Sequence, residues 1–128
     1  MIYKIAVVDD DPGLVDLITS ILEGEQTFAI MTANNGDQAL QLCRTYPPHL
    51  VLLDLTLPGK DGFSVLRLLK RDRRTASAKV VILTGQDSES IKSSAMKLGA
   101  DSFMTKPFGA KQLLDEVASL LRIDLVPA

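Results

Sequence analysis

Five polar residues lie directly after short apolar runs, at the points where buried strands would end. In chain order they are Asp9, Asp10, Asp54, Thr84 and Lys106. Crowded carboxylates repel one another unless a cation or a proton intervenes, and ligand sets made only of oxygen favour a hard ion such as Mg²⁺. A hydroxyl and an ammonium group suit the oxygens of a phosphoryl group. These residue types therefore indicate a carboxylate that can accept a phosphoryl group beside a bound cation.

The elements that would position these residues can be read from hydrophobic periodicity. Apolar runs at residues 5–8, 28–31, 50–53, 80–83 and 102–105 predict five strands. Three of these runs are continuously apolar, as is typical of parallel strands covered on both faces. Between the runs, apolar residues recur at three- and four-residue spacing, which predicts helices. Asp11 and Pro12 form a suitable helix start, and Gly24 and Gly99 lie where helices would end.

Strict alternation of strand and helix predicts one α/β domain, a doubly wound (βα)5 fold with a five-stranded parallel sheet. In such sheets the ligand crevice lies at the carboxyl ends of the strands, so the five polar residues would gather at one edge. The second predicted strand is followed by Asn34 and Asn35 and contributes no comparable group. We therefore expect the strand order 2-1-3-4-5, with that strand at one side of the sheet.

Composition excludes several other classes of protein. The chain has 128 residues, 46% hydrophobic and 23% charged, which is ordinary for a globular domain. A net charge of −2 disfavours direct nucleic-acid binding. One cysteine, Cys43, and one histidine, His49, exclude an internal disulfide and metal sites rich in cysteine or histidine. No apolar run approaches the roughly 20 residues of a membrane span, and no signal peptide is evident, so we expect no membrane contact and a cytoplasmic location.

Four motifs carry a resemblance to a known family. They are VVDDDP at residues 7–12, LLDLTLPGKDG at residues 52–62, ILTG at residues 82–85 and TKPF at residues 105–108. In this order and spacing they resemble the receiver domains of two-component response regulators, over roughly residues 3–122. The resemblance implies a flavodoxin-like, chemotaxis-receiver-like fold, with residues 1–122 as the receiver domain and residues 123–128 as a tail or the start of a linker.

The same resemblance implies roles for the acidic residues. Asp54 would be the phosphoacceptor. Asp10 and Asp54 would ligate Mg²⁺ directly, Asp9 would act mostly through water, and the backbone carbonyl of Thr56 would be a further ligand. Lys106 would pair with Asp54 or with its phosphoryl group.

A signalling role is implied as well. Thr84 would follow the phosphoryl oxygen, Phe103 occupies the switch aromatic position, and the Lys106–Pro107 bond would be cis. The donor would be a sensor histidine kinase or a phosphotransfer protein, and the receiver would catalyse its own phosphotransfer and dephosphorylation. The surface made by the fourth helix, fifth strand and fifth helix would contact an output domain or a second copy.

Three alternatives compete with this interpretation. A haloacid-dehalogenase-type phosphatase would need a second aspartate two residues after Asp54, where Thr56 stands. A flavodoxin-type flavin module would need a loop that cradles phosphate after the first strand, where three aspartates lie. A pseudo-receiver, acting only in protein binding, would not need the acidic residues and Lys106.

Three further features are interpreted as structural. The basic run KRDRR at residues 70–74 is read as a solvated helix end. Cys43 lies on an apolar helical stripe and is predicted to belong to the core. His49 enters the third predicted strand at the end opposite the polar residues, which indicates a structural role.

Overall fold

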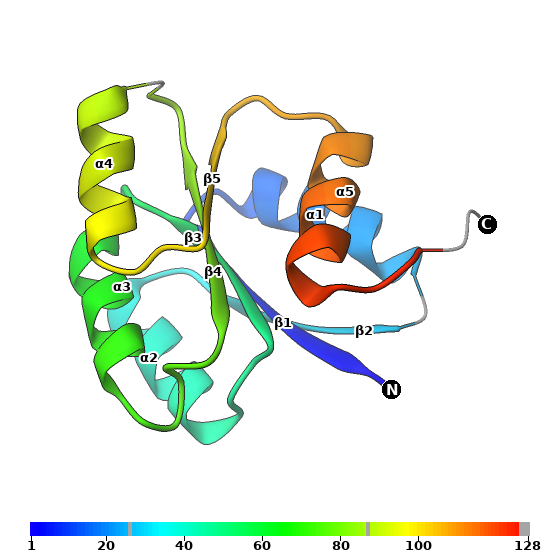
Figure 1. Ribbon diagram of the computed structural model, residues 1–128, viewed down its shortest axis with the longest axis horizontal. Coiled ribbons are helices and arrows are strands. Elements are labelled where there is room, and N and C mark those ends of the chain that lie inside the picture. Colours follow the sequence, from blue (N-terminus) through cyan, green and yellow to red (C-terminus); the bar gives the residue numbers. More distant parts are fainter. Residues whose placement is uncertain (26, 87, 126–128) are drawn as a thin grey trace.

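The computed structural model describes residues 1–25, 27–86 and 88–125, and within these residues the chain forms one five-stranded sheet (Figure 1). The strands are β1 (Tyr3–Val8), β2 (Phe28–Ala33), β3 (Leu50–Asp54), β4 (Lys79–Thr84) and β5 (Ser102–Thr105). Every neighbouring pair is parallel, and the order is β2-β1-β3-β4-β5. The predicted fold class and strand order are therefore confirmed.

Helices alternate with the strands and cover both faces of the sheet. They are α1 (Pro12–Glu23), α2 (Gly36–Thr45), α3 (Gly62–Arg71), α4 (Glu89–Lys97) and α5 (Ala110–Leu121). In Figure 1, α1 and α5 lie on one side of the sheet, while α2, α3 and α4 lie on the other. A hydrophobic core lies on each face of the sheet, and the central strands contribute side chains to both because successive side chains along a strand point to opposite faces. Leu52 packs in the core under α1 and α5, and Leu53 packs in the core under α2, α3 and α4.

Side-chain caps start the helices directly after the loops that carry polar residues. The Asp11 carboxylate accepts from the backbone N–H groups of Gly13 and Leu14, and Pro12 occupies the first turn of α1. Asn35, Asp61 and Ser88 cap α2, α3 and α4 in the same way. These caps fix where the loops before α1, α2, α3 and α4 end.

Two helices end at the glycines where the sequence predicts helix ends. Gly24 is the C-terminal cap of α1, and Gly99 follows the cap of α4 with φ of +103°. A positive φ is a conformation that glycine adopts without steric cost.

The interpretation of residues 70–74 as a solvated helix end was wrong in part. Lys70 Nζ donates to the Ala78 carbonyl at 2.7 Å and to Asp101 Oδ2 at 3.0 Å, and its side chain is only 19% exposed. Asp101 also accepts from the backbone N–H of Val80. Lys70 is thus held by partners that come from the start of β4 and of β5, which the local sequence pattern does not show.

Cys43 and His49 have the structural roles that were predicted. Cys43 is buried in the core beneath α2, and this burial raises the pKa of its thiol to about 11. His49 Nδ1 accepts from the backbone N–H of Lys4 at 2.9 Å, and the His49 ring lies edge-on to Tyr3. Among the helices that the structure describes, none has the length and apolarity needed to cross a membrane.

Candidate functional site

Three aspartates meet at the carboxyl edge of the sheet. Asp9 and Asp10 follow β1, and Asp54 is the last residue of the adjacent strand β3. Each offers a carboxylate oxygen, and these three atoms lie within 4.8 Å of one another. Asp9 and Asp54 are buried at 1% and 5% exposure, whereas Asp10 is exposed. The topology therefore brings together the three carboxylates that the sequence placed at strand ends.

Lys106 reaches the cluster from the loop after β5. Its Nζ atom lies 2.8 Å from Asp9 Oδ2 and 3.5 Å from Asp54 Oδ1. The backbone N–H of Lys106 donates to the Thr84 carbonyl, and the Lys106–Pro107 bond is cis, the isomer that the resemblance implies. The resemblance pointed to Asp54 as the partner of this lysine, but the shorter contact is with Asp9.

Both carboxylate oxygens of Asp9 accept hydrogen bonds from the chain, whereas only one oxygen of Asp54 does so among the described residues. Asp9 Oδ1 accepts from the backbone N–H of Asp11 at 3.0 Å, and Oδ2 accepts from Lys106. Asp54 Oδ1 accepts from the backbone N–H of Thr56 at 3.2 Å. No donor among the described residues bonds to Asp54 Oδ2. This oxygen is therefore the one that the protein leaves available for chemistry.

The electrostatics of the site favour a cation. Three carboxylates and one ammonium group leave two negative charges uncompensated. Burial raises the pKa of Asp54 and the neighbouring Asp9 charge adds to the rise, while the Thr56 N–H and Lys106 act in the opposite direction. Burial disfavours the Lys106 charge, but the hydrogen bond to Asp9 and the charge of Asp54 outweigh it and raise the pKa of Lys106. A divalent ion with a preference for oxygen ligands matches both the charge and the donor set.

The loop between β3 and α3 is held close to Asp54. Thr56 lies in this loop, two residues after Asp54. A Cβ atom at Gly62 would lie 2.6 Å from the Asp54 carbonyl oxygen and 2.5 Å from Leu55 Cα. Only glycine fits there, so Gly62 lets the start of α3 pack against the end of β3.

Thr84 and Phe103 lie on one face of the sheet. Thr84 ends β4, is 5% exposed, and accepts from the Gln86 N–H through its Oγ1 atom. Phe103 pairs in register with Ile82, two residues before Thr84, and packs half-buried against the core under α2, α3 and α4. Since residues two apart on a strand share a face, Phe103 is a diagonal neighbour of Thr84.

Two open hollows adjoin the aspartates. One, of about 530 Å³, lies beside Asp10 and the loop residues Pro58 and Gly59. The other, of about 280 Å³, lies between the ends of β1 and β2 and includes Asp9 and Asp10. The cluster is thus accessible from the outside on the Asp10 side.

Two contacts of this site were not predicted from sequence. Asp9 and Asp10 are adjacent and chemically identical, and only the position of Lys106 in the folded chain shows which one it pairs with. The packing of Gly62 on Asp54 depends on the path of the loop, although the DG pair before a helical stripe is a visible signal.

Comparison with known proteins shows the family. Residues 5–118 match the response regulator receiver domain. The chain is 38% identical over 125 residues to the DNA-binding dual master transcriptional regulator RpaA of Synechocystis sp., covering 97% of this chain and 52% of that protein. It is 39% identical over 122 residues to the DNA-binding response regulator MtrA of Mycolicibacterium smegmatis, covering 95% of this chain and 52% of that protein.

A solved structure shows the same relationship. The BeF3-activated receiver domain of DrrB, from Thermotoga maritima, superimposes with a TM-score of 0.85 at 31% identity, over 95% of this chain and 99% of that one.

The chain belongs to the response regulator receiver domain family. The prediction of a phosphoacceptor signalling switch of a two-component system is confirmed at the level of this family. The chain spans about half the length of the curated relatives that it matches.

Proposed function

We propose that this chain accepts a phosphoryl group on Asp54 from a phosphohistidine of a sensor histidine kinase or a phosphotransfer protein. The observation that supports this most directly is the contrast between the two buried aspartates. Asp9 has both oxygens engaged by donors of the chain, whereas Asp54 keeps Oδ2 without a donor among the described residues. Asp54 also ends the central strand, and one of its carboxylate oxygens lies within 4.8 Å of an oxygen of the exposed Asp10.

The transfer is a displacement at phosphorus. Asp54 Oδ2 forms the new O–P bond while the P–N bond to the donor histidine breaks, and the imidazole leaves with the electron pair and takes up a proton. Lys106 remains within reach of both Asp9 and Asp54, so it is placed to contact a phosphoryl oxygen after transfer. Release is hydrolysis of the acyl phosphate by water.

The acidic residues would hold Mg²⁺. Asp10 and Asp54 would bind it directly, Asp9 mostly through water, and the Thr56 backbone carbonyl would be a further ligand. When bound there, the ion would supply positive charge for the phosphoryl oxygens during transfer. Because this chain supplies these groups itself, we propose that it catalyses its own phosphotransfer and dephosphorylation and acts on no separate substrate.

Output would pass through the surface of α4, β5 and α5. Thr84 would move toward the phosphoryl oxygen and Phe103 would fill the space beneath α4. Met96 on α4 and Lys111 on α5 are exposed there, and Lys92 lies one turn before Met96. The partner would be an output domain or a second copy of the chain, with no direct nucleic-acid or membrane binding by this domain.

We place the receiver domain at residues 1–122 and a tail or linker start at residues 123–128, of which 126–128 lie outside the described residues. Support comes from the end of α5 at Leu121 and from relatives about twice as long as this chain. We also place the chain in the cytoplasm, where histidine kinases present their phosphohistidine.

The test is labelling with a small phosphodonor, such as acetyl phosphate, in the presence of Mg²⁺. One acid-labile phosphate per chain is expected, and Asp54→Asn should abolish it. Asp115→Asn, which removes an exposed carboxylate on α5, is the matched control and should label normally. Labelling of Asp54→Asn at the rate of the unaltered chain would refute the assignment.

A further inference from the structure

A hollow lies at the amino edge of the sheet, opposite the edge that carries the three aspartates. Its volume is about 480 Å³, within the range of small-molecule sites. We call it the amino-edge hollow, and it is lined by Tyr3, Pro48, His49, Ser77, Lys79, Leu120, Leu121 and Arg122. β3 begins directly after His49 and ends at Asp54, so the whole length of this strand separates the hollow from the acidic site.

Backbone hydrogen bonds fix the strand starts that line the hollow. The His49 N–H donates to the Lys4 carbonyl at 2.9 Å, and the Lys79 N–H donates to the His49 carbonyl at 2.9 Å. The starts of β1, β3 and β4 are therefore held side by side. His49 Nδ1 accepts from the Lys4 N–H, so in the neutral ring the proton lies on Nε2, which is then a donor.

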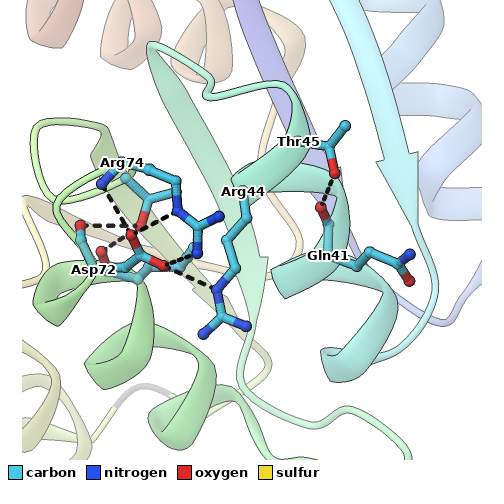
Figure 2. A network of polar contacts seen from close by, with 7 residues as sticks. Gln41, Arg44, Thr45, Asp72 and Arg74 are labelled. Carbon is cyan, nitrogen blue, oxygen red and sulfur yellow. Dashed lines mark hydrogen bonds and ion pairs between the residues drawn. The ribbon is translucent and has the colours of Figure 1, made fainter.

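The loop between α3 and β4, which carries Ser77, is held by Asp72 (Figure 2). Asp72 Oδ2 accepts from Arg44 Nε at 3.0 Å and from Arg74 Nη2 at 2.9 Å. The Asp72 carbonyl accepts from the Ala76 N–H at 2.8 Å. These contacts tie the loop to α2 and to the end of α3, and so fix the path by which it reaches the hollow.

The amino-edge hollow is positively charged. Lys79 and Arg122 line it, and no carboxylate of the described residues does so. Lys79 Nζ lies 3.9 Å from Asp101 Oδ1, but Lys70 binds the same carboxylate more closely, at 3.0 Å. Within the described part of the chain, no ion pair involves Arg122. The hollow therefore offers cations that the chain itself does not balance.

The backbone of Arg122 is a second sign that its side chain matters. Arg122 caps the carboxyl end of α5 with φ of 56° and ψ of 48°, a left-handed conformation. Glycine adopts a positive φ without steric cost, as Gly99 does after α4, whereas a residue with a Cβ atom does not. The carboxyl end of α5 favours a cation but carries only about half an elementary negative charge. Arg122 therefore keeps most of its capacity to bind an anion.

The rest of the lining is apolar. Pro48 is buried, and Leu120 and Leu121 are half-buried and pack against the core under α1 and α5. These residues form a fixed apolar wall beside the cations. The combination suits a ligand that has a charged group at one end and an apolar body.

We propose that the amino-edge hollow binds a small organic anion, with its carboxylate on Arg122 and Lys79 and its apolar body against Pro48, Leu120 and Leu121. A guanidinium fork suits a carboxylate geometrically, and an ammonium group adds a second charge. The proposal does not depend on phosphorylation of Asp54, which lies at the opposite edge of the sheet.

The experiment titrates hexanoate into the full chain at constant ionic strength and follows its amide resonances. Saturable shifts are expected around the hollow, at His49, Lys79 and Arg122. Arg122→Gln should raise the dissociation constant about tenfold, because the charged fork is lost. Arg67→Gln, which removes an exposed arginine on α3, is the matched control and should change it by less than about twofold.

Lys79→Gln removes the second cation from a different element and should also weaken hexanoate binding. Melting temperatures show whether each variant is folded. Hexanamide, which has no charge, and inorganic phosphate, which has no apolar body, are titrated in parallel, and both should bind at least about tenfold more weakly than hexanoate.

The absence of saturable shifts at the hollow would overturn the proposal, as would equal dissociation constants for the two folded cation variants and Arg67→Gln. Hexanamide binding as tight as hexanoate binding would show an apolar contact without anion recognition. Phosphate binding as tight as hexanoate binding would show a site for inorganic anions. Either result would also refute the proposal.

Discussion

Asp9 and Lys106, which are 97 residues apart in the chain, form a hydrogen-bonded ion pair with 2.8 Å between Oδ2 and Nζ. Asp9 is 1% exposed, and Lys106 is the cation nearest to it. The lysine that is expected to contact a phosphoryl group is therefore already bound to a structural partner before any transfer. Two roles follow for Lys106, one in the stability of the acidic site and one in signalling.

The first prediction concerns the stability role. Lys106→Ala leaves the buried Asp9 charge without its partner and should lower the free energy of unfolding by about 1–3 kcal/mol in the presence of a chelator. Urea unfolding measures this difference. Lys111→Ala, which breaks an exposed pair with Asp115, is the control and should change stability by less than about 0.5 kcal/mol. Equal stabilities of Lys106→Ala and the unaltered chain would show that the pair with Asp9 contributes nothing.

The second prediction concerns metal binding. The carboxylates that would bind Mg²⁺ come together only in the folded chain, where two negative charges are uncompensated. Because Mg²⁺ then binds the folded state and not the unfolded state, Mg²⁺ should raise the melting temperature. When the Mg²⁺ concentration is a hundred times the dissociation constant, binding raises the free energy of unfolding by about 2.7 kcal/mol. Asp10→Asn removes one repelling charge and one ligand, so it should stabilise the metal-free protein and abolish the response to Mg²⁺.

Calorimetric scans with chelator and with millimolar Mg²⁺ measure both effects. Asp37→Asn, at an exposed position beside the same hollow, should keep the metal response. A melting temperature that is independent of Mg²⁺ in the unaltered chain would contradict the prediction.

The third prediction is a pH dependence in metal-free solution. Burial raises the pKa of Asp54 above its ordinary value of 3.8. The stabilisation from this shift is fully present below pH 3.8 and is lost as pH rises through the raised pKa. At neutral pH, Asp54→Asn should therefore be more stable than the unaltered chain, and this advantage should shrink as the pH falls toward 3.8.

Asp72 provides a contrast of opposite sign. Its hydrogen bonds with Arg74 hold the pKa of Asp72 well below 3.8, with Arg44 adding to the effect. Asp72 therefore contributes stability above pH 3.8 that is lost as the pH falls further, and Asp72→Asn should be less stable at neutral pH. Urea unfolding at a series of pH values measures both variants. The same sign of change in the two variants at neutral pH would refute this electrostatic account.

Much of the fold could be predicted because its determinants are local. The continuous apolar runs of β1, β3 and β4 are typical of buried parallel strands, and the polar residues at their ends then had to meet at one edge. Asp11 could be recognised as a cap because capping involves only the next three residues. The position of Asp54 followed from the same local logic.

The remaining contacts join distant parts of the chain. Three contacts have no local sequence signal: the choice of Asp9 over Asp10 by Lys106, the bond from Lys70 to Asp101, and the bond from Arg44 to Asp72. In each case a long flexible cation selects one of several carboxylates by distance in the folded state. Such selection depends on the packing of helices on the sheet, which periodicity alone does not specify.

The last prediction concerns coupling between Thr84 and Phe103. Thr84 is buried at the end of β4, and its diagonal neighbour Phe103 is only half-buried, so Phe103 can gain contacts if Thr84 moves toward a phosphoryl oxygen. Full burial of a phenylalanine is worth roughly 1.5–3 kcal/mol, which is comparable with the free-energy difference between two conformers of a switch.

Beryllofluoride, a stand-in for the phosphoryl group, should therefore shift amide resonances on α4, β5 and α5 in the unaltered chain. In Thr84→Ala these remote shifts should be largely lost, while shifts around Asp54 persist. Thr105→Ala, which alters the in-register neighbour of Thr84 on β5, is the control and should keep the remote response. Remote shifts of equal size in Thr84→Ala, or shifts confined to the acidic site in the unaltered chain, would show that the hydroxyl of Thr84 does not carry the signal.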